Sequence, residues 1–235
     1  MPSTSDQDLV VAIDGPSGSG KSSVSRAVAR ALGIGYLDTG AMYRAVTWWC
    51  LARGIDLDDE PAVARAAEEL PLEIGSDPGN VTVVVDGLDV TDAIRLTRIT
   101  SVVSKVATNL GVRATLVAQQ RTLIARTAAL TGGCVAEGRD ITTVVAPDAA
   151  VRVLLTASEE ARLSRRAKEV HGAADAATVA ATRDQVVRRD RDDSTVSDFT
   201  SAADGVVTLD TSHLDFDGAV EAVLDVVRSV VRAGS

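Results

Sequence analysis

The chain has 235 residues, a formal net charge of −9, and a composition of 46% hydrophobic and 24% charged residues. This length and composition predict a globular protein of one or two domains with a sizeable core. The acidic balance argues against a protein that holds DNA or RNA by electrostatic attraction. No apolar run reaches the length of a membrane span or a signal peptide, so we expect a cytoplasmic protein without a membrane partner.

Strands and helices alternate along most of the chain. Short apolar runs predict buried strands over residues 10–13, 35–37, 134–136, 151–155 and 206–209. Apolar spacing near 3.6 residues predicts helices over 22–32, 41–52, 97–107, 112–130 and 216–232, with further helices after Ser158 and up to about residue 191. Residues 169–180 are small and weakly patterned, which indicates a mobile segment. The alternation predicts a parallel α/β sheet with helices on both faces.

One stretch breaks this alternation. Residues 72–74 and 81–85 have the pattern of two short strands, and the sequence SDPGN stands between them. Asp, Pro, Gly and Asn favour tight turns, so the pair predicts an antiparallel hairpin. We therefore interpret the region from about 41 to 108 as an insertion into the parallel sheet.

Residues 15–22, GPSGSGKS, match the phosphate-binding pattern GxxxxGK[ST] between a predicted strand and a predicted helix. Glycines let successive backbone N–H groups turn toward phosphate oxygens, and the following helix presents the positive end of its dipole. The lysine of this P-loop pattern reaches the β- and γ-phosphates, and its serine hydroxyl ligates Mg²⁺. We expect ATP and Mg²⁺ to bind here, with Ser22 as a metal ligand. The expected nucleotide contacts are Gly15, Pro16, Ser17, Gly18, Ser19, Gly20, Lys21, Ser22 and Ser23.

Arginines follow the predicted ends of several strands, where ligands of an open α/β sheet bind. Arg44 follows the strand over 35–37, Arg139 follows that over 134–136, and a cluster over 162–191 follows that over 151–155. Arginine stays charged and grips phosphate bidentately, so this set predicts a second anionic ligand beside the nucleotide. The chain has no NKxD-like motif, which weighs against a GTPase switch, and no apolar run that ends in an acidic pair.

The chain contains, in this order, DGPSGSGKSS, YLDTGAMYRAV, DGLDVTDAIR, VSKVATNLGVR with a following QQR, EGRDITTVVAPDA and RRDRDDST. In order and spacing these motifs resemble those of the bacterial cytidylate kinase family. The resemblance covers about residues 10 to 225. The pair LDTGAMYR and EGRD is much more specific than the phosphate-binding loop alone.

The resemblance implies an α/β fold, namely a P-loop kinase with a central parallel five-stranded sheet flanked by helices, an inserted monophosphate-binding domain and a short lid. It implies a core domain over 9–40 and 109–235, a lid over about 162–182 within it, and an inserted CMP-binding domain over 41–108. The implied reaction is Mg²⁺-dependent transfer of the γ-phosphoryl group of ATP to CMP or dCMP, which gives CDP or dCDP. The implied partners are these small molecules and no nucleic acid, and the implied state is a monomer.

Site residues carry over from the family position by position. The implied substrate-binding residues are Thr39, Tyr43 and Arg44 beside the monophosphate, Ser104 and Arg113 on the cytosine side, Arg139 for phosphate, Asp140 for the base, and Arg189 and Asp193 for phosphate and sugar. The implied catalytic residues are Lys21, Arg162 and Arg166, and Arg165 is a further lid candidate to reach the transferred group.

Cytosine offers an amino donor where uracil offers an acceptor, so a carboxylate at Asp140 is expected to favour CMP over UMP. Leaving a buried polar group unpaired costs about 1–3 kcal/mol, which predicts a preference and not an absolute exclusion. The chain departs from the family at Thr142, where glycine is frequent, and at Val196, where a substrate-contacting arginine is usual. Two alternatives stay open, a kinase for another acceptor such as UMP and a non-catalytic ATP-binding switch. A switch has no need of a second anion site.

Overall fold

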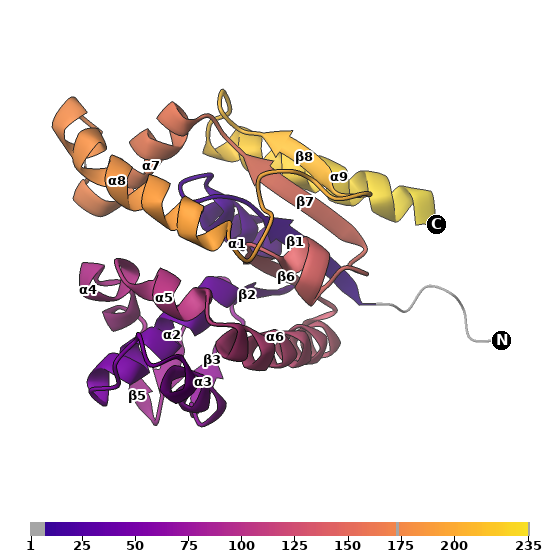
Figure 1. The fold of residues 1–235 in the computed structure, drawn as a ribbon. Helices are drawn as coiled ribbons and strands as arrows, with labels where there is room; N and C mark the ends of the chain where they lie inside the picture. The colour runs from indigo at the N-terminus through magenta and orange to yellow at the C-terminus, as the bar shows by residue number, and fades with distance from the viewer. Residues whose placement is uncertain (1–7, 173, 235) are drawn as a thin grey trace.

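A five-stranded parallel sheet forms the centre of the molecule (Figure 1). The computed structural model describes residues 8–172 and 174–234. The strands of the sheet are β1 (Leu9–Asp14), β2 (Gly35–Asp38), β6 (Gly133–Gly138), β7 (Val151–Thr156) and β8 (Val207–Asp210). They lie in the order β2-β6-β1-β7-β8, and each neighbouring pair is parallel. The predicted α/β fold is therefore confirmed, and each of these strands overlaps a predicted one.

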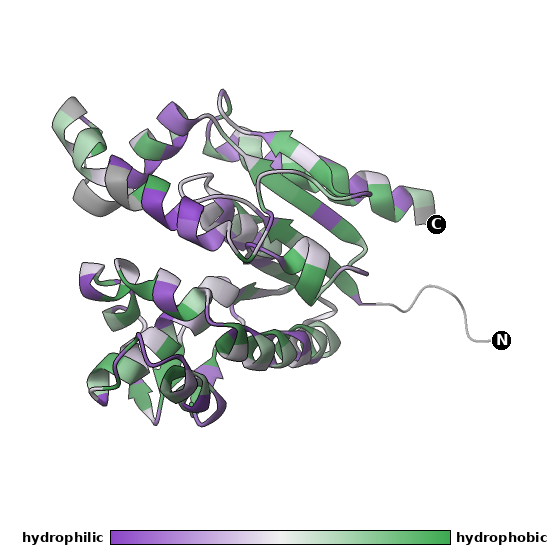
Figure 2. Ribbon diagram, viewed as in Figure 1, coloured by the Kyte–Doolittle hydropathy of each residue, from purple (hydrophilic) through white to green (hydrophobic). Residues whose placement is uncertain are grey.

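Helices cover both faces of this sheet. On one face α1 (Lys21–Leu32) and α9 (Phe216–Gly234) bury apolar side chains of β1, β6 and β7. On the other face lie α6 (Leu110–Thr131) and the short π-helical turn η2 (Ile141–Val145). In Figure 2 strands β1 and β7 are green along most of their length, which is the pattern of strands buried on two faces.

The chain between β2 and α6 forms a second lobe below the sheet in Figure 1. Its elements are α2 (Thr39–Ala52), α3 (Glu60–Glu68), β3 (Leu72–Ile74), β4 (Val83–Val85), β5 (Leu88–Asp89), the 3₁₀ turn η1 (Ala93–Arg95), α4 (Thr97–Thr100) and α5 (Val103–Ala107). As predicted, β3 and β4 pair antiparallel, with Leu72 opposite Val85. The sequence patterns predicted neither α3 nor the third strand β5. A hydrophobic cluster that includes Met42, Trp49 and Ile94 holds this lobe together with the start of α6.

Two helical regions differ from the predictions. Residues 97–107 form two short helices because Val102, with φ −119° and ψ −2°, departs from helical backbone between them. Residues 169–180, predicted as a mobile segment, are largely helical outside Ala173, which lies beyond the described residues. The C-cap of α7 (Glu159–His171) is Gly172, which has the left-handed conformation. The N-cap of α8 (Ala176–Asp193) is Asp175, whose carboxylate accepts hydrogen bonds from two N–H groups of the first turn. Both are ordinary helix caps.

The tip of the β3–β4 hairpin contacts the central sheet and its first helix. The carbonyl of Pro78 accepts hydrogen bonds from Arg26 and Arg30 of α1, at N···O distances from 2.9 to 3.3 Å. The backbone N–H of Tyr36 in β2 donates to the carbonyl of Ser76 at 2.9 Å. The second lobe is thus tied to the core at the edge strand β2 and at α1.

The two cysteines, Cys50 and Cys134, are buried free thiols. Burial raises the pKa of Cys134 to about 12 and that of Cys50 to about 11, so both stay protonated and unreactive at neutral pH. Within the described part of the chain, no helix combines the length and the apolar character that crossing a membrane requires.

Candidate active site

A cavity of about 480 Å³ lies at the carboxyl ends of β1, β2 and β6. The predicted site residues that line it are Ser17, Gly18, Ser19, Gly20, Lys21, Ser22, Ser23, Thr39, Tyr43, Arg44, Arg113, Arg139, Asp140, Arg166, Arg189 and Asp193. The predicted residues outside its lining are Gly15, Pro16, Ser104 and Arg162. The structure therefore brings together side chains that are far apart in sequence, at the edge where parallel α/β sheets bind ligands.

The loop between β1 and α1 depends on glycine at two positions. Gly18 and Gly20 have φ angles of 76° and 88°, in the left-handed region that favours glycine. A Cβ atom on Gly18 would also collide with the backbone carbonyl of Arg162. Gly20 is the N-cap of α1 and has no side chain with which to cap it. The N–H groups of the first turn are therefore left for an anion in the cavity.

Glu137, the penultimate residue of β6, is a cavity residue that the sequence patterns did not single out. It is 2% exposed, and its carboxylate accepts hydrogen bonds from the hydroxyls of Ser22 at 2.6 Å and Tyr36 at 3.1 Å. The ammonium of Lys21 lies 3.7 Å from its other oxygen. The sequence signal for Glu137 is the apolar run over 134–136, which ends in this single acid and not in an acidic pair.

Lys21 lies in an environment that disfavours its charge. Burial, followed by the nearby guanidinium of Arg139, lowers the pKa of Lys21 to about 8, although the carboxylate of Glu137 opposes this shift. An anionic ligand beside Lys21 would raise this pKa again, because an opposite charge within about 4–6 Å favours the charged form.

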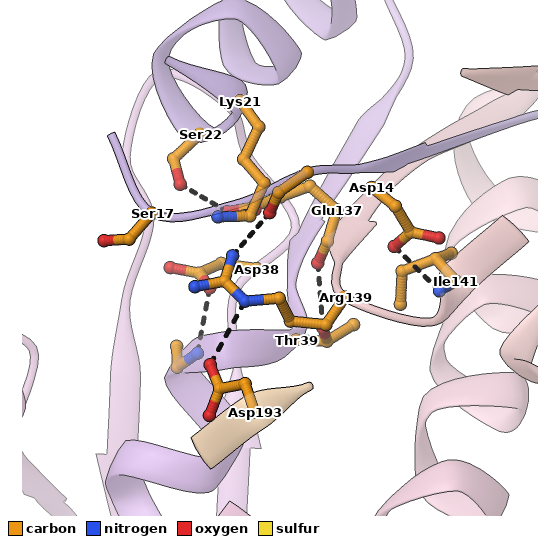
Figure 3. A network of polar contacts seen from close by, with 12 residues as sticks. Asp14, Ser17, Lys21, Ser22, Asp38, Thr39, Glu137, Arg139, Ile141 and Asp193 are labelled. Atoms are coloured by element: carbon orange, nitrogen blue, oxygen red, sulfur yellow. Dashed lines mark hydrogen bonds and ion pairs between the residues drawn. The ribbon is translucent and has the colours of Figure 1, made fainter. Parts of the chain in front are cut away.

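Arg139 connects the P-loop to α8 (Figure 3). Its Nε donates to Asp193 at 3.1 Å, and its Nη1 donates to the carbonyl of Gly15 at 2.5 Å. The ring of Phe199 lies 4.8 Å from the guanidinium carbon. Three separate contacts thus fix this side chain at the mouth of the P-loop.

Asp190 and Arg162 hold the P-loop from the side of the predicted lid. The backbone N–H of Ser17 donates to Asp190 at 3.0 Å, and its carbonyl accepts from Arg162 at 3.0 Å. Arg162 and Asp190 also form an ion pair with each other. Arg162 is therefore engaged with the loop and does not line the cavity, whereas Arg165 and Arg166 do. Asp190 was not among the predicted site residues.

The far end of the cavity holds a buried ion pair between Arg113 of α6 and Asp140, which follows β6. The exposed fractions of these two side chains are 13% and 7%. Ser104 of α5 lies nearby and donates to Asp193 of α8 at 3.5 Å. A carboxylate and a guanidinium side by side present an acceptor and donors to any ligand that enters this end.

Arg44 reaches the cavity from the first turns of α2. Its Nη2 donates to Asp38 at 2.8 Å, and Asp38 also caps α2 by accepting from the N–H of Ala41 at 2.9 Å. Burial raises the pKa of Asp38, but the guanidiniums of Arg44 and Arg95 outweigh this effect and lower it. Thr39 donates to the carbonyl of Glu137 at 2.8 Å and so joins α2 to β6. Arg95, from η1, is a second cavity arginine that the patterns did not single out.

Several buried polar atoms of the cavity have no hydrogen-bond partner among the described residues. They are the hydroxyls of Ser19 and Tyr43 and the Nε atoms of Arg44 and Arg189, although Nε of Arg189 also lies 3.6 Å from the carboxylate of Asp193 in an ion pair. Burial, and after it the charge of Arg139, also lowers the pKa of Arg189 to about 10, so it stays charged at neutral pH. Buried donors without partners are costly, and an anionic ligand in the cavity would satisfy them.

Val196, one of the two positions that depart from the family, also lines the cavity. Thr142, the other, is buried beneath it, where its hydroxyl donates to Asp14 at 2.7 Å.

Comparison with known proteins agrees with this geometry. The family model for cytidylate kinase matches residues 11–229. The cytidylate kinase of Cutibacterium acnes is 49% identical over 225 residues, which are 95% of this chain and 98% of that protein. The cytidylate kinase of Streptomyces coelicolor is 48% identical over 228 residues, 96% of this chain and 95% of that protein. That of Streptomyces griseus is 45% identical over 225 residues, 95% of this chain and 94% of that protein. The chain belongs to the cytidylate kinase family.

Proposed function

We propose that the protein is a cytidylate kinase, which transfers the γ-phosphoryl group of ATP to CMP or dCMP and releases ADP with CDP or dCDP. The observation that carries this proposal is that one cavity joins a P-loop to a second set of arginines with unsatisfied buried donors. A nucleotide-binding switch would need only the first of these. A kinase whose acceptor is itself a phosphate needs both.

The donor side is formed by the P-loop. The loop over residues 15–23, through the backbone N–H groups that are not already bonded within the protein, and the ammonium of Lys21 are proposed to bind the phosphates of ATP. Mg²⁺ fits the residues present, since the Ser22 hydroxyl and the Glu137 carboxylate are oxygen ligands 2.6 Å apart. Among the described residues no cluster of three or more acidic, His or Cys side chains forms a metal cage, which suits an ion that is held largely by substrate phosphates. When bound, Mg²⁺ would neutralise part of the negative charge on the phosphates.

The acceptor side is proposed to bind CMP with its phosphate toward the P-loop. Arg44, Arg139 and Arg189 would hold the phosphate beside Thr39 and Tyr43. Arg113, Asp140 and Ser104 would read the cytosine, and Asp193 would bind the sugar. The segment over 41–108 is proposed as the CMP-binding domain, which its separate hydrophobic cluster supports.

The transfer itself needs no covalent enzyme intermediate and no general base, because the attacking atom is already a phosphate oxygen. The protein positions donor and acceptor in line and stabilises the negative charge on the transferred group. Lys21 and Arg166 are the proposed catalytic contacts from the cavity lining. Arg162 would join them only after it releases Asp190, so we propose that closure of the lid over about 162–182 breaks this ion pair. Closure also excludes water that would otherwise hydrolyse ATP.

We propose that the enzyme acts as a monomer in the cytoplasm. A single chain supplies both the donor and the acceptor side of the cavity, and the two thiols are free, as in a reducing compartment.

The test measures ADP formation from ATP and Mg²⁺ in the presence of CMP, dCMP, UMP, AMP or no acceptor. We expect turnover mainly with CMP and dCMP, and its loss in Lys21→Ala. Lys105→Ala is the matched control, because this lysine pairs with the exposed Asp58 outside the cavity lining. Equal turnover with UMP would remove the role given to Asp140, and no acceptor-dependent turnover would favour the binding-only switch.

A further inference from the structure

Asp14 is a buried carboxylate directly before the P-loop. It ends β1 and is 1% exposed. Its side chain accepts three hydrogen bonds, from the N–H of Ile141 at 2.9 Å and from the N–H and hydroxyl of Thr142 at 2.8 and 2.7 Å. Figure 3 shows the contact with Ile141 beside the P-loop strand. Asp14 itself is not part of the cavity lining.

These contacts hold the backbone that follows Arg139 and Asp140. Asp140, two residues beyond the end of β6, has φ −147° and ψ 25° and leads into the short turn η2. The first N–H groups of a helical turn have no partner within the turn, so their direction is set by whatever accepts from them. Here the acceptor is the carboxylate of Asp14. It therefore fixes where the chain turns immediately after the two side chains that face the cavity.

A second link joins the same two segments, and again the segment after β6 donates. The carbonyl of Gly15, the next residue after Asp14, accepts from Nη1 of Arg139 at 2.5 Å. Residues 14 and 15 therefore hold both the backbone and a side chain of the loop after β6. The start of the donor loop and the acceptor-facing pair are coupled at this junction.

The charge on Asp14 is costly in this place. Burial raises its pKa to about 6, and among the described residues no ion pair with a lysine or arginine compensates it. A buried carboxylate without a cationic partner destabilises a fold unless hydrogen bonds satisfy it. A neutral side chain could join the two segments with a smaller free-energy cost of burial. Only a carboxylate accepts from all three donors at once, so its presence indicates that the backbone of residues 141 and 142 must be held in one position.

We propose that Asp14 is a positioning residue for acceptor recognition, which acts through the backbone of residues 141 and 142 to aim Asp140 and Arg139 at the base and phosphate of the acceptor. The hydroxyl of Thr142 is the third support of this contact. The inference rests on the proposed cytidylate kinase activity. It assigns part of the selectivity between cytosine and uracil to a residue that touches neither.

The test compares Asp14→Asn, Thr142→Val and Thr142→Ser with the unchanged protein, using kcat and KM for CMP and for UMP at saturating ATP. Asparagine keeps one acceptor but turns an N–H₂ group toward a backbone donor. We expect Asp14→Asn to lower the CMP-to-UMP ratio of kcat/KM by about tenfold, chiefly through the KM for CMP. Thr142→Val should lower the ratio by roughly threefold, whereas Thr142→Ser, which keeps the hydroxyl, should have the ratio of the unchanged protein.

A merely structural role predicts a different result. It would lower the melting temperature and the active fraction, and so reduce kcat for both acceptors equally. Thr131→Val is the control for this, because it removes the hydroxyl that bonds Gly35, Thr127 and Gly133 at the opposite end of β6. It should lower the melting temperature and leave the ratio unchanged.

An unchanged ratio in Asp14→Asn overturns the inference. If that variant does not fold, Thr142→Val decides alone, and a ratio equal to that of the unchanged protein overturns it. Failure of the unchanged protein to phosphorylate CMP would instead overturn the proposed function, so the two failures are distinguishable.

Discussion

Glu137 offers the sharpest test of how the donor side works. Its carboxylate accepts from the hydroxyls of Ser22 and Tyr36 and lies 3.7 Å from the ammonium of Lys21. Hydrogen bonds to a charged group contribute about 1.5–3 kcal/mol each, and those to a neutral group about 0.5–1.5 kcal/mol. Glu137→Gln keeps one neutral acceptor for both hydroxyls, so we expect it to lose about 2 kcal/mol of unfolding free energy. Glu137→Ala removes both bonds and should lose about 3–6 kcal/mol.

The substitution should also weaken the binding of Mg²⁺ that turnover requires, beyond its effect on the free energy of unfolding. If Glu137 orients the Ser22 hydroxyl toward Mg²⁺, its replacement by glutamine should raise the Mg²⁺ concentration needed for half-maximal turnover by about 10–100-fold. The assay is the Mg²⁺ dependence of kcat with CMP as the acceptor, together with denaturant unfolding of each variant. Tyr36→Phe is the matched control, because it removes one of the two hydroxyls and leaves the carboxylate beside Ser22 and Lys21. It should lose about 1.5–3 kcal/mol of unfolding free energy and keep the normal Mg²⁺ dependence.

The reasoning is refuted if Glu137→Gln folds and shows the Mg²⁺ dependence and kcat of the unchanged enzyme. It is also refuted if Tyr36→Phe shifts the Mg²⁺ dependence as strongly, since the effect would then come from local packing and not from the carboxylate.

Three further predictions follow from the geometry of the P-loop and of the hairpin contact. In the ligand-free protein the pKa of Lys21 is lowered to about 8, so above that pH the binding of ATP requires Lys21 to take up a proton. The affinity for ATP should therefore fall by up to about tenfold per pH unit from pH 8 to 9.5. Calorimetry in buffers of different ionisation enthalpy should detect this proton uptake, and Lys21→Arg should abolish both effects. Gly18→Ala places a Cβ at a φ of 76° and against a backbone carbonyl, so it should weaken ATP binding at least about tenfold while CMP binding persists in equilibrium titrations. Arg26→Ala and Arg30→Ala each leave the other arginine to donate to the Pro78 carbonyl and should each cost less than about 1 kcal/mol in unfolding free energy, whereas the double variant should cost more than their sum.

The sequence predicted the central sheet well because each of its strands is a short apolar run, and β2 and β7 are followed by helices with side-chain caps at Asp38 and Ser158. It predicted the P-loop because that motif needs glycine and lysine at fixed spacing. Glu137 was not predicted, because the apolar run before it ends in one acid and not in an acidic pair, whereas one carboxylate at the end of β6 is enough to bond Ser22.

The second lobe and the lid show where local patterns were insufficient. Residues 169–180 have a composition typical of a loop, but Gly172 and Asp175 cap two helices that pack on each other. The role of Asp190 was not predictable, because its contact with the P-loop joins residues 173 positions apart. The motifs correctly gathered Arg44, Arg113 and Arg139 at one cavity, but sequence spacing carries no information on which arginines already have carboxylate partners.

The hairpin contact at β2 has a consequence for how the protein behaves at high concentration. An edge strand presents unpaired backbone groups that other chains can join, and such edges promote aggregation. β2 is an edge of the central sheet, yet the N–H of Tyr36 is bonded to Ser76 and that of Gly35 to Thr131. The insertion that is proposed to bind the acceptor therefore also shields this edge. Truncating the hairpin tip should promote self-association even where the cavity residues are untouched.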